Sequence, residues 1–249
     1  MLQPDDPERS MIIDHPSLDT SPPRLHPLFM KASQNSVERM EAKEEITGAR
    51  FTDHITNRYF PLTPGTTYVY EGTKDGVPQR DEFTVTRDTK TILGVRCVVV
   101  HDVVTEEGNL AEETYDWYAQ DSEGNVWYFG EDSKEFEGGK VVSTKGSWEA
   151  GVDGAQPGIV MEAFPRVGDT YRQEYYQGEA EDMAKVLNVN ESTTVSAGSY
   201  KEVVVTEDFT SLEPDVVEHK YFAPGVGFVM GSMVKGGSEQ IELVKITTD

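Results

Sequence analysis

From residue 57 onward, hydrophobic and polar residues alternate in short runs, the pattern expected of half-buried β-strands. An Asp-Gly pair within residues 74–76 separates two such runs and predicts a hairpin. The later runs are rich in β-branched and aromatic residues and recur about every 10 to 15 residues, as in an antiparallel meander. The expected strands cover residues 68–71, 82–86, 96–104, 113–120, 126–129, 170–176, 182–189, 200–209, 216–223, 227–234 and 240–246.

The second half of this pattern is a degenerate copy of the first. Residues 60–68 return, one residue shorter, as residues 164–171, and residues 94–100 return as residues 198–205. The offset is about 104 residues for each landmark, and internal repetition outranks local propensity when a fold is assigned. We therefore expect an all-β fold in which two tandem antiparallel meanders form a barrel or paired half-barrels, lipocalin-like in general character.

Four segments follow from this repeat. Residues 1–50 are rich in proline and lack the alternation, so they are expected to form a partly ordered N-terminal arm with one amphipathic helix over residues 28–46. The two copies of the meander occupy residues 51–130 and 164–249. Residues 131–163 join them and have no counterpart elsewhere in the chain.

The joining segment is expected to hold a hairpin around Gly138-Gly139 and then a long glycine-rich loop. Long irregular loops in compact β proteins often carry function. We predict that Trp148 packs at the barrel mouth and that Glu149 or Asp153 faces the cleft. The alternative is that the loop only plugs one end of the barrel.

Composition and charge argue against several classes of function. The chain has 249 residues, a net charge of −23 and a pI near 4.5, which argues against nucleic-acid binding because phosphate recognition needs clustered Lys and Arg. No run approaches the roughly 18 apolar residues of a membrane span. Residues 1–21 do not resemble a secretory signal, so the expected location is cytoplasmic, or secreted if the sequence starts after a removed signal. The single cysteine, Cys97, is expected to be a buried structural thiol.

No catalytic, nucleotide-binding or metal-binding motif is present, and no cofactor or metal site is expected. Candidate chemistry therefore comes from individual residues. Tyr115 and Trp117 share one strand face, and the repeat places His219 and Tyr221 at the matching positions. On the inner face of a barrel, the three aromatic residues would contact a ligand. His219 would be either a hydrogen-bonded core residue or a general base.

Charged residues complete the candidate set. Glu181 and Asp182 form an acidic pair at a strand start, and paired carboxylates suit general acid–base catalysis. Arg172 lies on a strand face with Glu174 and could join a polar network across the barrel. Asp116 lies within a strand between two aromatic residues, a costly place for an unpaired carboxylate. The candidate catalytic residues are His219, Glu181 and Asp182, and the candidate ligand-binding residues are Tyr115, Trp117, Trp148, Glu149, Asp153, Arg172 and Tyr221.

Residues 55–65 resemble the opening signature of a family of uncharacterised bacterial β-rich proteins, with the pattern N-x-Y-F-P-L-x-P-G. The resemblance continues through residues 116–121, 124–131 and 148–158. Arg58 stands where the family is expected to carry a proline, which affects only the entry to the first strand. The resemblance implies a shared β fold and brings no known activity with it.

Three functions remain open at this point. The leading hypothesis is that the protein binds a hydrophobic or aromatic small molecule in a cleft between the two halves. The second is a metal-independent lyase, isomerase or hydrolase that uses His219 and nearby carboxylates in the same cleft. The third is an interaction module that uses the acidic surface and the N-terminal arm. The sequence does not indicate an oligomeric state.

Overall fold

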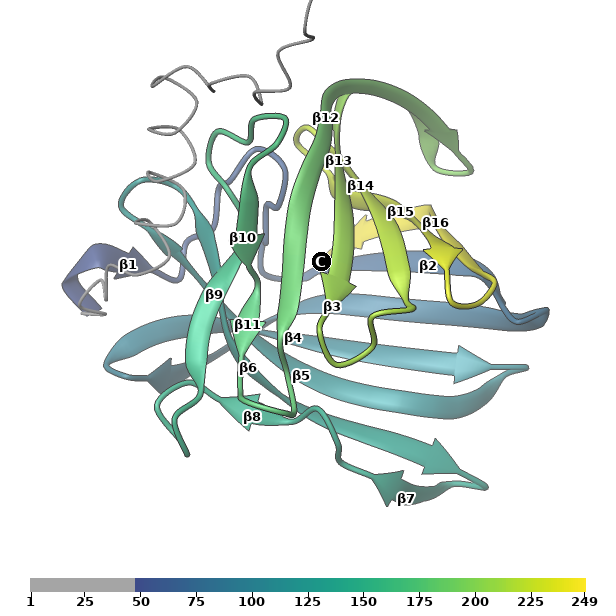
Figure 1. Cartoon of the computed structure of the whole chain (residues 1–249), viewed down its shortest axis with the longest axis horizontal. Coiled ribbons are helices and arrows are strands. Elements are labelled where there is room, and N and C mark those ends of the chain that lie inside the picture. Colours follow the sequence, from purple (N-terminus) through teal and green to yellow (C-terminus); the bar gives the residue numbers. More distant parts are fainter. Residues whose placement is uncertain (1–47) are drawn as a thin grey trace, which may run out of the picture. The chain divides into compact units, whose positions relative to one another are not determined.

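Antiparallel β-strands account for most of residues 48–249, the part of the chain that the computed structural model describes (Figure 1). The all-β antiparallel fold predicted from the alternation is confirmed. The helix expected over residues 28–46, and nearly all of the arm expected over residues 1–50, lie outside the described residues. No helix among the described residues has the length and apolar character needed to cross a membrane.

The described elements fall into three groups along the chain. The first contains η1 (Gly48–Arg50), β1 (Phe51–Thr52), β2 (Thr66–Lys74), β3 (Val77–Ile92), β4 (Val95–Glu106), β5 (Asn109–Asp121) and β6 (Val126–Glu137). The second contains β7 (Lys140–Ser143), β8 (Trp148–Glu149), β9 (Gln156–Met161), β10 (Thr170–Arg172) and β11 (Glu174–Tyr175). The third contains β12 (Asp182–Val195), β13 (Gly198–Thr210), β14 (Val217–Ala223), β15 (Gly227–Lys235) and β16 (Glu239–Thr248).

Two meanders make up most of the sheet. Each strand from β2 to β6 pairs with the next, and so does each strand from β12 to β16. Strand β16 also pairs with β2, from Glu239 opposite Lys74 to Thr248 opposite Thr66, which joins the meanders edge to edge. In Figure 1 the blue and teal strands of the first meander run across the direction of the green strands of the second. Whether the meanders are copies of one another, and where such copies begin and end, stay predictions.

One short segment nearly closes the sheet into a barrel. Strand β10 pairs with β12, whereas β11, two residues further on, pairs with β9, which in turn pairs with β6. Between them, the backbone N–H of Gln173 donates a 2.8 Å hydrogen bond to the carbonyl of Asp182. A single stretch of six residues therefore bridges the two ends of the sheet. The hairpin expected around Gly138-Gly139 is confirmed, because β6 and β7 pair on either side of it.

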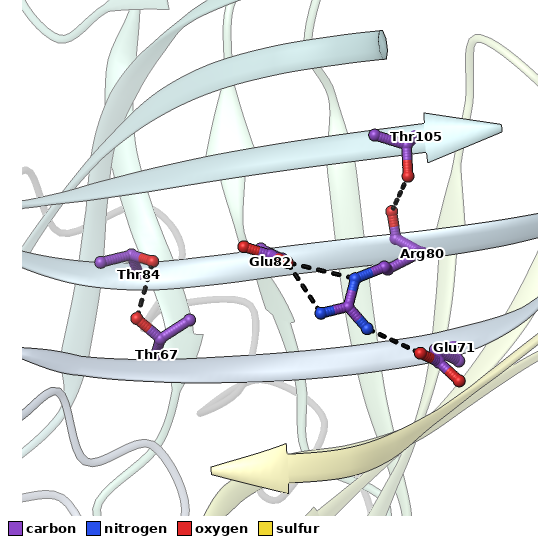
Figure 2. A network of polar contacts seen from close by, with 6 residues as sticks. All are labelled: Thr67, Glu71, Arg80, Glu82, Thr84 and Thr105. Atoms are coloured by element: carbon purple, nitrogen blue, oxygen red, sulfur yellow. Dashed lines mark hydrogen bonds and ion pairs between the residues drawn. The ribbon is translucent and has the colours of Figure 1, made fainter. Parts of the chain in front are cut away.

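Side chains alternate between the inside of the barrel and its surface. On β2 and β3, Tyr70 and Asp81 lie opposite each other and both line the interior. The neighbouring positions point outward: Arg80 forms ion pairs with Glu71 at 2.6 Å and with Glu82 at 2.8 Å (Figure 2). These outward side chains are exposed, so the two faces of this hairpin have different chemistry.

The segment between β1 and β2 closes the end of the barrel beside the β14–β15 turn. The ring of Phe60 packs against Tyr118 and Phe222, with centroid distances of 5.5 Å and 6.3 Å. The backbone N–H of Gly225, in that turn, donates a 2.7 Å hydrogen bond to the carbonyl of Arg58. This end of the interior is therefore apolar.

A second packed layer covers the outside of β4 to β6. The ring of Phe51, on β1, lies edge-on to Trp127 and Phe129, with centroid distances of 5.9 Å and 5.4 Å. On this part of the sheet both faces bury aromatic rings. The alternation of apolar and polar residues therefore does not identify the inner face here. Cys97 is fully buried, as expected, and burial raises the pKa of its thiol to about 12.

Candidate functional site

The barrel interior contains a cavity of about 360 Å³, within the range of about 300 to 1,000 Å³ typical of small-molecule sites. Its walls come from the inner faces of both meanders, from the segment between β1 and β2, and from β9 and β11. It therefore draws on nearly every part of the described chain.

Aromatic rings form the apolar part of the cavity. Tyr118 and Tyr128 face each other across β5 and β6 and stack with centroids 4.8 Å apart and planes at 17°. Across the barrel, Phe228 packs against Phe222 at 5.8 Å and against Tyr70 at 5.2 Å. These rings give flat apolar walls to a ligand, and the tyrosine hydroxyls add polar groups at their edges.

Carboxylates form the polar part of the same cavity. Asp81, Asp102, Glu131, Glu174 and Asp182 all contribute to its lining. Asp81 and Asp102 lie on long strands in phase with buried inward residues, because strand side chains alternate in direction. Glu131 faces inward together with Tyr128 because the β5–β6 register shifts between them. The interior is thus aromatic and acidic together, an unusual combination for a protein core.

Behind this lining lies one more carboxylate, Asp116, which is buried and lies opposite Glu131 in the β5–β6 register. The hydroxyl of Tyr128 donates a 2.6 Å hydrogen bond to Oδ1 of Asp116. Tyr128 is therefore the hydrogen-bond partner that a carboxyl buried at this position needs.

Several of these carboxyls have raised pKa values, chiefly because burial disfavours their charged form. The pKa of Asp116 rises to about 8, with Asp102 adding to the effect of burial. The pKa of Glu131 rises to about 9 through burial and the neighbouring Asp116, and that of Glu174 rises to about 8 through burial and Asp182. These groups therefore hold protons near neutral pH.

Asp81 and Asp102 form a coupled pair on adjacent strands. Burial raises the pKa of both carboxyls, and the neighbouring charge of Asp81 raises that of Asp102 further. The Oδ1 atom of each side chain is buried and has no hydrogen-bond partner. Such orphaned oxygens are rare in folded proteins and call for an explanation.

Lys220 is the one lysine that lines the cavity among the described residues, and it lies on β14. Its Nζ is 3.2 Å from Oδ2 of Asp208 and 3.5 Å from Oε2 of Glu218. Burial acts to lower its pKa, but Glu218, Asp208 and Asp182 outweigh that effect and the pKa is raised. Its positive charge is therefore already matched by carboxylates on its own side of the barrel.

No three His, Cys, Asp or Glu side chains within residues 48–249 come together in a way that could hold a metal ion. The carboxylates are spread along several strands rather than converging on one point. The arrangement suits an extended ligand better than a single ion.

Two of the sequence-predicted residues lie in or against this cavity. Asp182 lines it at an exposed position. Trp148 is buried beside it, where its Nε1 donates a 2.8 Å hydrogen bond to Oε2 of Glu174 and its ring meets Tyr128 edge-on at 5.4 Å.

The aromatic candidates on β5 and β14 lie on the opposite side of the sheet. Tyr118 lines the cavity, so its neighbour Trp117 points outward, where Lys90 covers its ring at 3.2 Å. Tyr115 also points outward and stacks on His101. The expectation that this face is the inner one was wrong, because the outer face here is covered too and aromatic character does not distinguish the faces.

The same parity places His219 and Tyr221 outside, because Lys220, between them, lines the cavity. There, Nε2 of His219 lies 3.9 Å from Oε2 of Glu207. Arg172 and Glu181 line a separate hollow of about 510 Å³, which also includes Glu207 and other outward residues of β12 and β13. The structure therefore does not bring His219 together with Asp182.

The two carboxylates of the joining loop also lie away from the cavity. Glu149 forms a 2.7 Å ion pair with Lys90 on the outer face. Asp153 is exposed in a turn with a positive φ of 49°. The expectation that one of them faces the cleft is contradicted, because β8 pairs with β6 in a register that turns Trp148 inward and Glu149 outward.

Sequence reasoning missed Asp81, Asp102, Glu131 and Lys220. It named Glu174 only as sharing a strand face with Arg172, whereas Glu174 lines the cavity and Arg172 lines the outer hollow. The sequence did contain a signal for Asp81 and Asp102. Each shares the parity of hydrophobic residues on its strand, such as Phe83 and Val85 after Asp81. A carboxylate in phase with buried positions marks a polar interior.

No family model matches the chain, and no curated protein matches it. Among solved structures, a "putative exported protein with YmcC-like fold" from Bacteroides fragilis is 15% identical, with a TM-score of 0.45 over 78% of this chain and 100% of that one. A "putative lipoprotein" from Parabacteroides distasonis is 12% identical, with a TM-score of 0.42 over 77% of this chain and 99% of that one. Likenesses this distant transfer no chemistry to this chain. The family resemblance stays a prediction, and nothing found supports the expected cytoplasmic location.

Proposed function

We propose that this protein binds a small molecule with a hydrophobic or aromatic body inside the barrel. The observation that supports this most is the cavity of about 360 Å³ bounded by stacked and edge-on aromatic rings. Rings such as Tyr118 and Phe228 offer apolar surface, and a few polar groups along one side can orient a ligand. The outer hollow of about 510 Å³ is the competing location.

A cavity-filling substitution tests the proposal. Val226 lines the cavity, so Val226→Trp would occupy the space of a ligand. Val142→Trp is the matched control, because Val142 is 57% exposed and does not line the cavity. Met183→Trp fills the outer hollow instead. Binding of a polarity-sensitive apolar fluorophore, measured by titration, should weaken at least about tenfold in Val226→Trp alone.

The result would count against the proposal if Met183→Trp, rather than Val226→Trp, reduced binding, since the site would then be the outer hollow. Native mass spectrometry of protein purified from its own host adds a direct search for a retained ligand. The enzyme hypothesis based on His219 with Glu181 and Asp182 has no such geometric support, and it stays a prediction together with the acidic interaction module.

A further inference from the structure

The cavity carries a local excess of negative or proton-holding groups on the side formed by β3 to β6. Within residues 48–249, no lysine or arginine forms an ion pair with Asp81, Asp102 or Glu131. Lys220 is engaged by carboxylates on the opposite meander. Arg80 is adjacent to Asp81 in sequence but points outward to Glu71 and Glu82 (Figure 2).

The orphaned oxygens lie on this same side. Oδ1 of Asp81 and Oδ1 of Asp102 are both buried and accept no hydrogen bond from a donor group of the described residues. Leaving a buried acceptor unpaired destabilises the folded state, and more so when the group is charged. In the β3–β4 register Asp81 lies opposite Val104 and Asp102 opposite Phe83, so the two carboxyls are diagonal neighbours on one face. One donor group with several N–H bonds can reach across such a diagonal pair.

Aromatic residues flank the pair. Tyr70 lies directly opposite Asp81 in the β2–β3 register, and Phe83 lies directly opposite Asp102 in the β3–β4 register. Both rings line the cavity. Aromatic faces attract cations as well as burying apolar surface, so a carboxylate pair between rings favours a charged group attached to an organic body.

From these contacts we infer that the ligand is an organic cation, an ammonium or guanidinium group joined to a hydrophobic or aromatic body. Asp81 and Asp102 accept hydrogen bonds from the cationic group, and the body lies against Tyr118, Tyr128 and Phe228. This inference rests on the proposed function and specifies its ligand class. A metal ion fits less well, because no three ligating side chains converge within the described residues.

The test compares amines with neutral alcohols of the same shape on the unmodified protein. The pairs are tryptamine with tryptophol, 2-phenylethylamine with 2-phenylethanol, and octylamine with octanol, each titrated by calorimetry, with calcium and magnesium chloride titrated separately. At least one amine should bind about tenfold or more tightly than its alcohol, as expected for a hydrogen-bonded charge in a desolvated site.

Variants then locate the charge. Asp81→Asn combined with Asp102→Asn should remove the amine's advantage while leaving alcohol binding unchanged, and Glu71→Gln, on the outer face of the same hairpin, should change neither. If no amine exceeds its alcohol, or if a divalent metal ion binds instead, the inference is overturned. Because the amine–alcohol comparison uses unmodified protein, it stands even if the double variant does not fold. Fluorophore binding blocked by Val226→Trp would then still support the proposed function.

Discussion

Trp148 and Glu174 are joined inside the barrel by a 2.8 Å hydrogen bond from the indole Nε1 to the carboxylate Oε2. The bond connects β8, in the segment between the meanders, with β11, in the stretch that nearly closes the sheet. It also supplies a donor to a buried carboxyl whose pKa is raised to about 8 by burial. The loop expected at the barrel mouth therefore contributes to the wall of the interior.

This bond predicts a large effect for Trp148→Phe. The substitution keeps an aromatic ring against Tyr128 but leaves Glu174 without its donor, so the free energy of unfolding should fall by about 1 to 3 kcal/mol. Urea denaturation measures the loss. Trp127→Phe is the matched control: Trp127 also donates to a carboxylate, that of Asp121, which keeps three other hydrogen bonds. Equal losses in the two variants would show that ring packing, not the bond to Glu174, determines the effect.

The strands could be predicted from the sequence where their signals are local. The Asp-Gly hairpin after Lys74 and the alternation along β3 and β4 follow from turn chemistry and strand geometry. The inner face could not be assigned on β5, because Phe51 covers the outer side near Trp127, so both sides of this part of the sheet are apolar.

The site was harder to predict than the fold. Strands β10 and β11 have three and two residues and pair with different partners, and no pattern of side chains specifies such a division. Glu149 or Asp153 was expected in the cleft because both lie among glycines, but Lys90 holds Glu149 outside. That contact joins residues far apart in sequence, so only the folded register reveals it.

The raised carboxyl pKa values predict that stability falls as pH rises. Asp116 and Glu174 have pKa values of about 8, and Glu131 about 9, whereas unfolded carboxyls titrate near 4. Between about pH 4 and 9 the folded state binds more protons than the unfolded state, so the free energy of unfolding decreases with pH. The melting temperature should therefore fall by at least about 4 °C between pH 5 and pH 9, the effect of roughly 1.4 kcal/mol in a chain of this size.

Asp116→Asn is the control for this pH dependence. The amide oxygen can still accept the hydrogen bond from Tyr128, but the side chain no longer titrates. Its melting temperature should fall less steeply with pH than that of the unmodified protein. A melting temperature that stayed level or rose from pH 5 to pH 9 would contradict the burial of these carboxyls.

Substitutions on the outer face of the β2–β3 hairpin should change the free energy of unfolding only slightly. Arg80 forms ion pairs with Glu71 and Glu82, but all three side chains are substantially exposed (Figure 2). Solvent and salt screen such pairs, so Arg80→Ala should cost less than about 1 kcal/mol, and the cost should shrink in 1 M sodium chloride. Urea denaturation at two salt concentrations checks this, and a cost above 2 kcal/mol that salt leaves unchanged would mean that the network has a structural role.

Gly130 links the backbone of β6 to the position of Trp148, and this gives the last prediction. Its φ is 130°, and a Cβ added there would lie 2.2 Å from the carbonyl oxygen of Trp148. Gly130→Ala must therefore displace β8 or bend β6, in addition to the strain of a positive φ. Gly138→Ala is the matched control, because Gly138 also has a positive φ of 57° but has open space around it.

The two alanine variants should differ in how much stability they lose and in which other properties they change. Gly138→Ala should cost about 1 to 2 kcal/mol from backbone strain alone, whereas Gly130→Ala should cost clearly more. Because β8 carries Trp148 into the interior, only Gly130→Ala should also change the tryptophan fluorescence and weaken fluorophore binding in the cavity. If Gly130→Ala destabilised the protein without changing either signal, β8 would not set the wall of the cavity, and Trp148 would matter for stability alone.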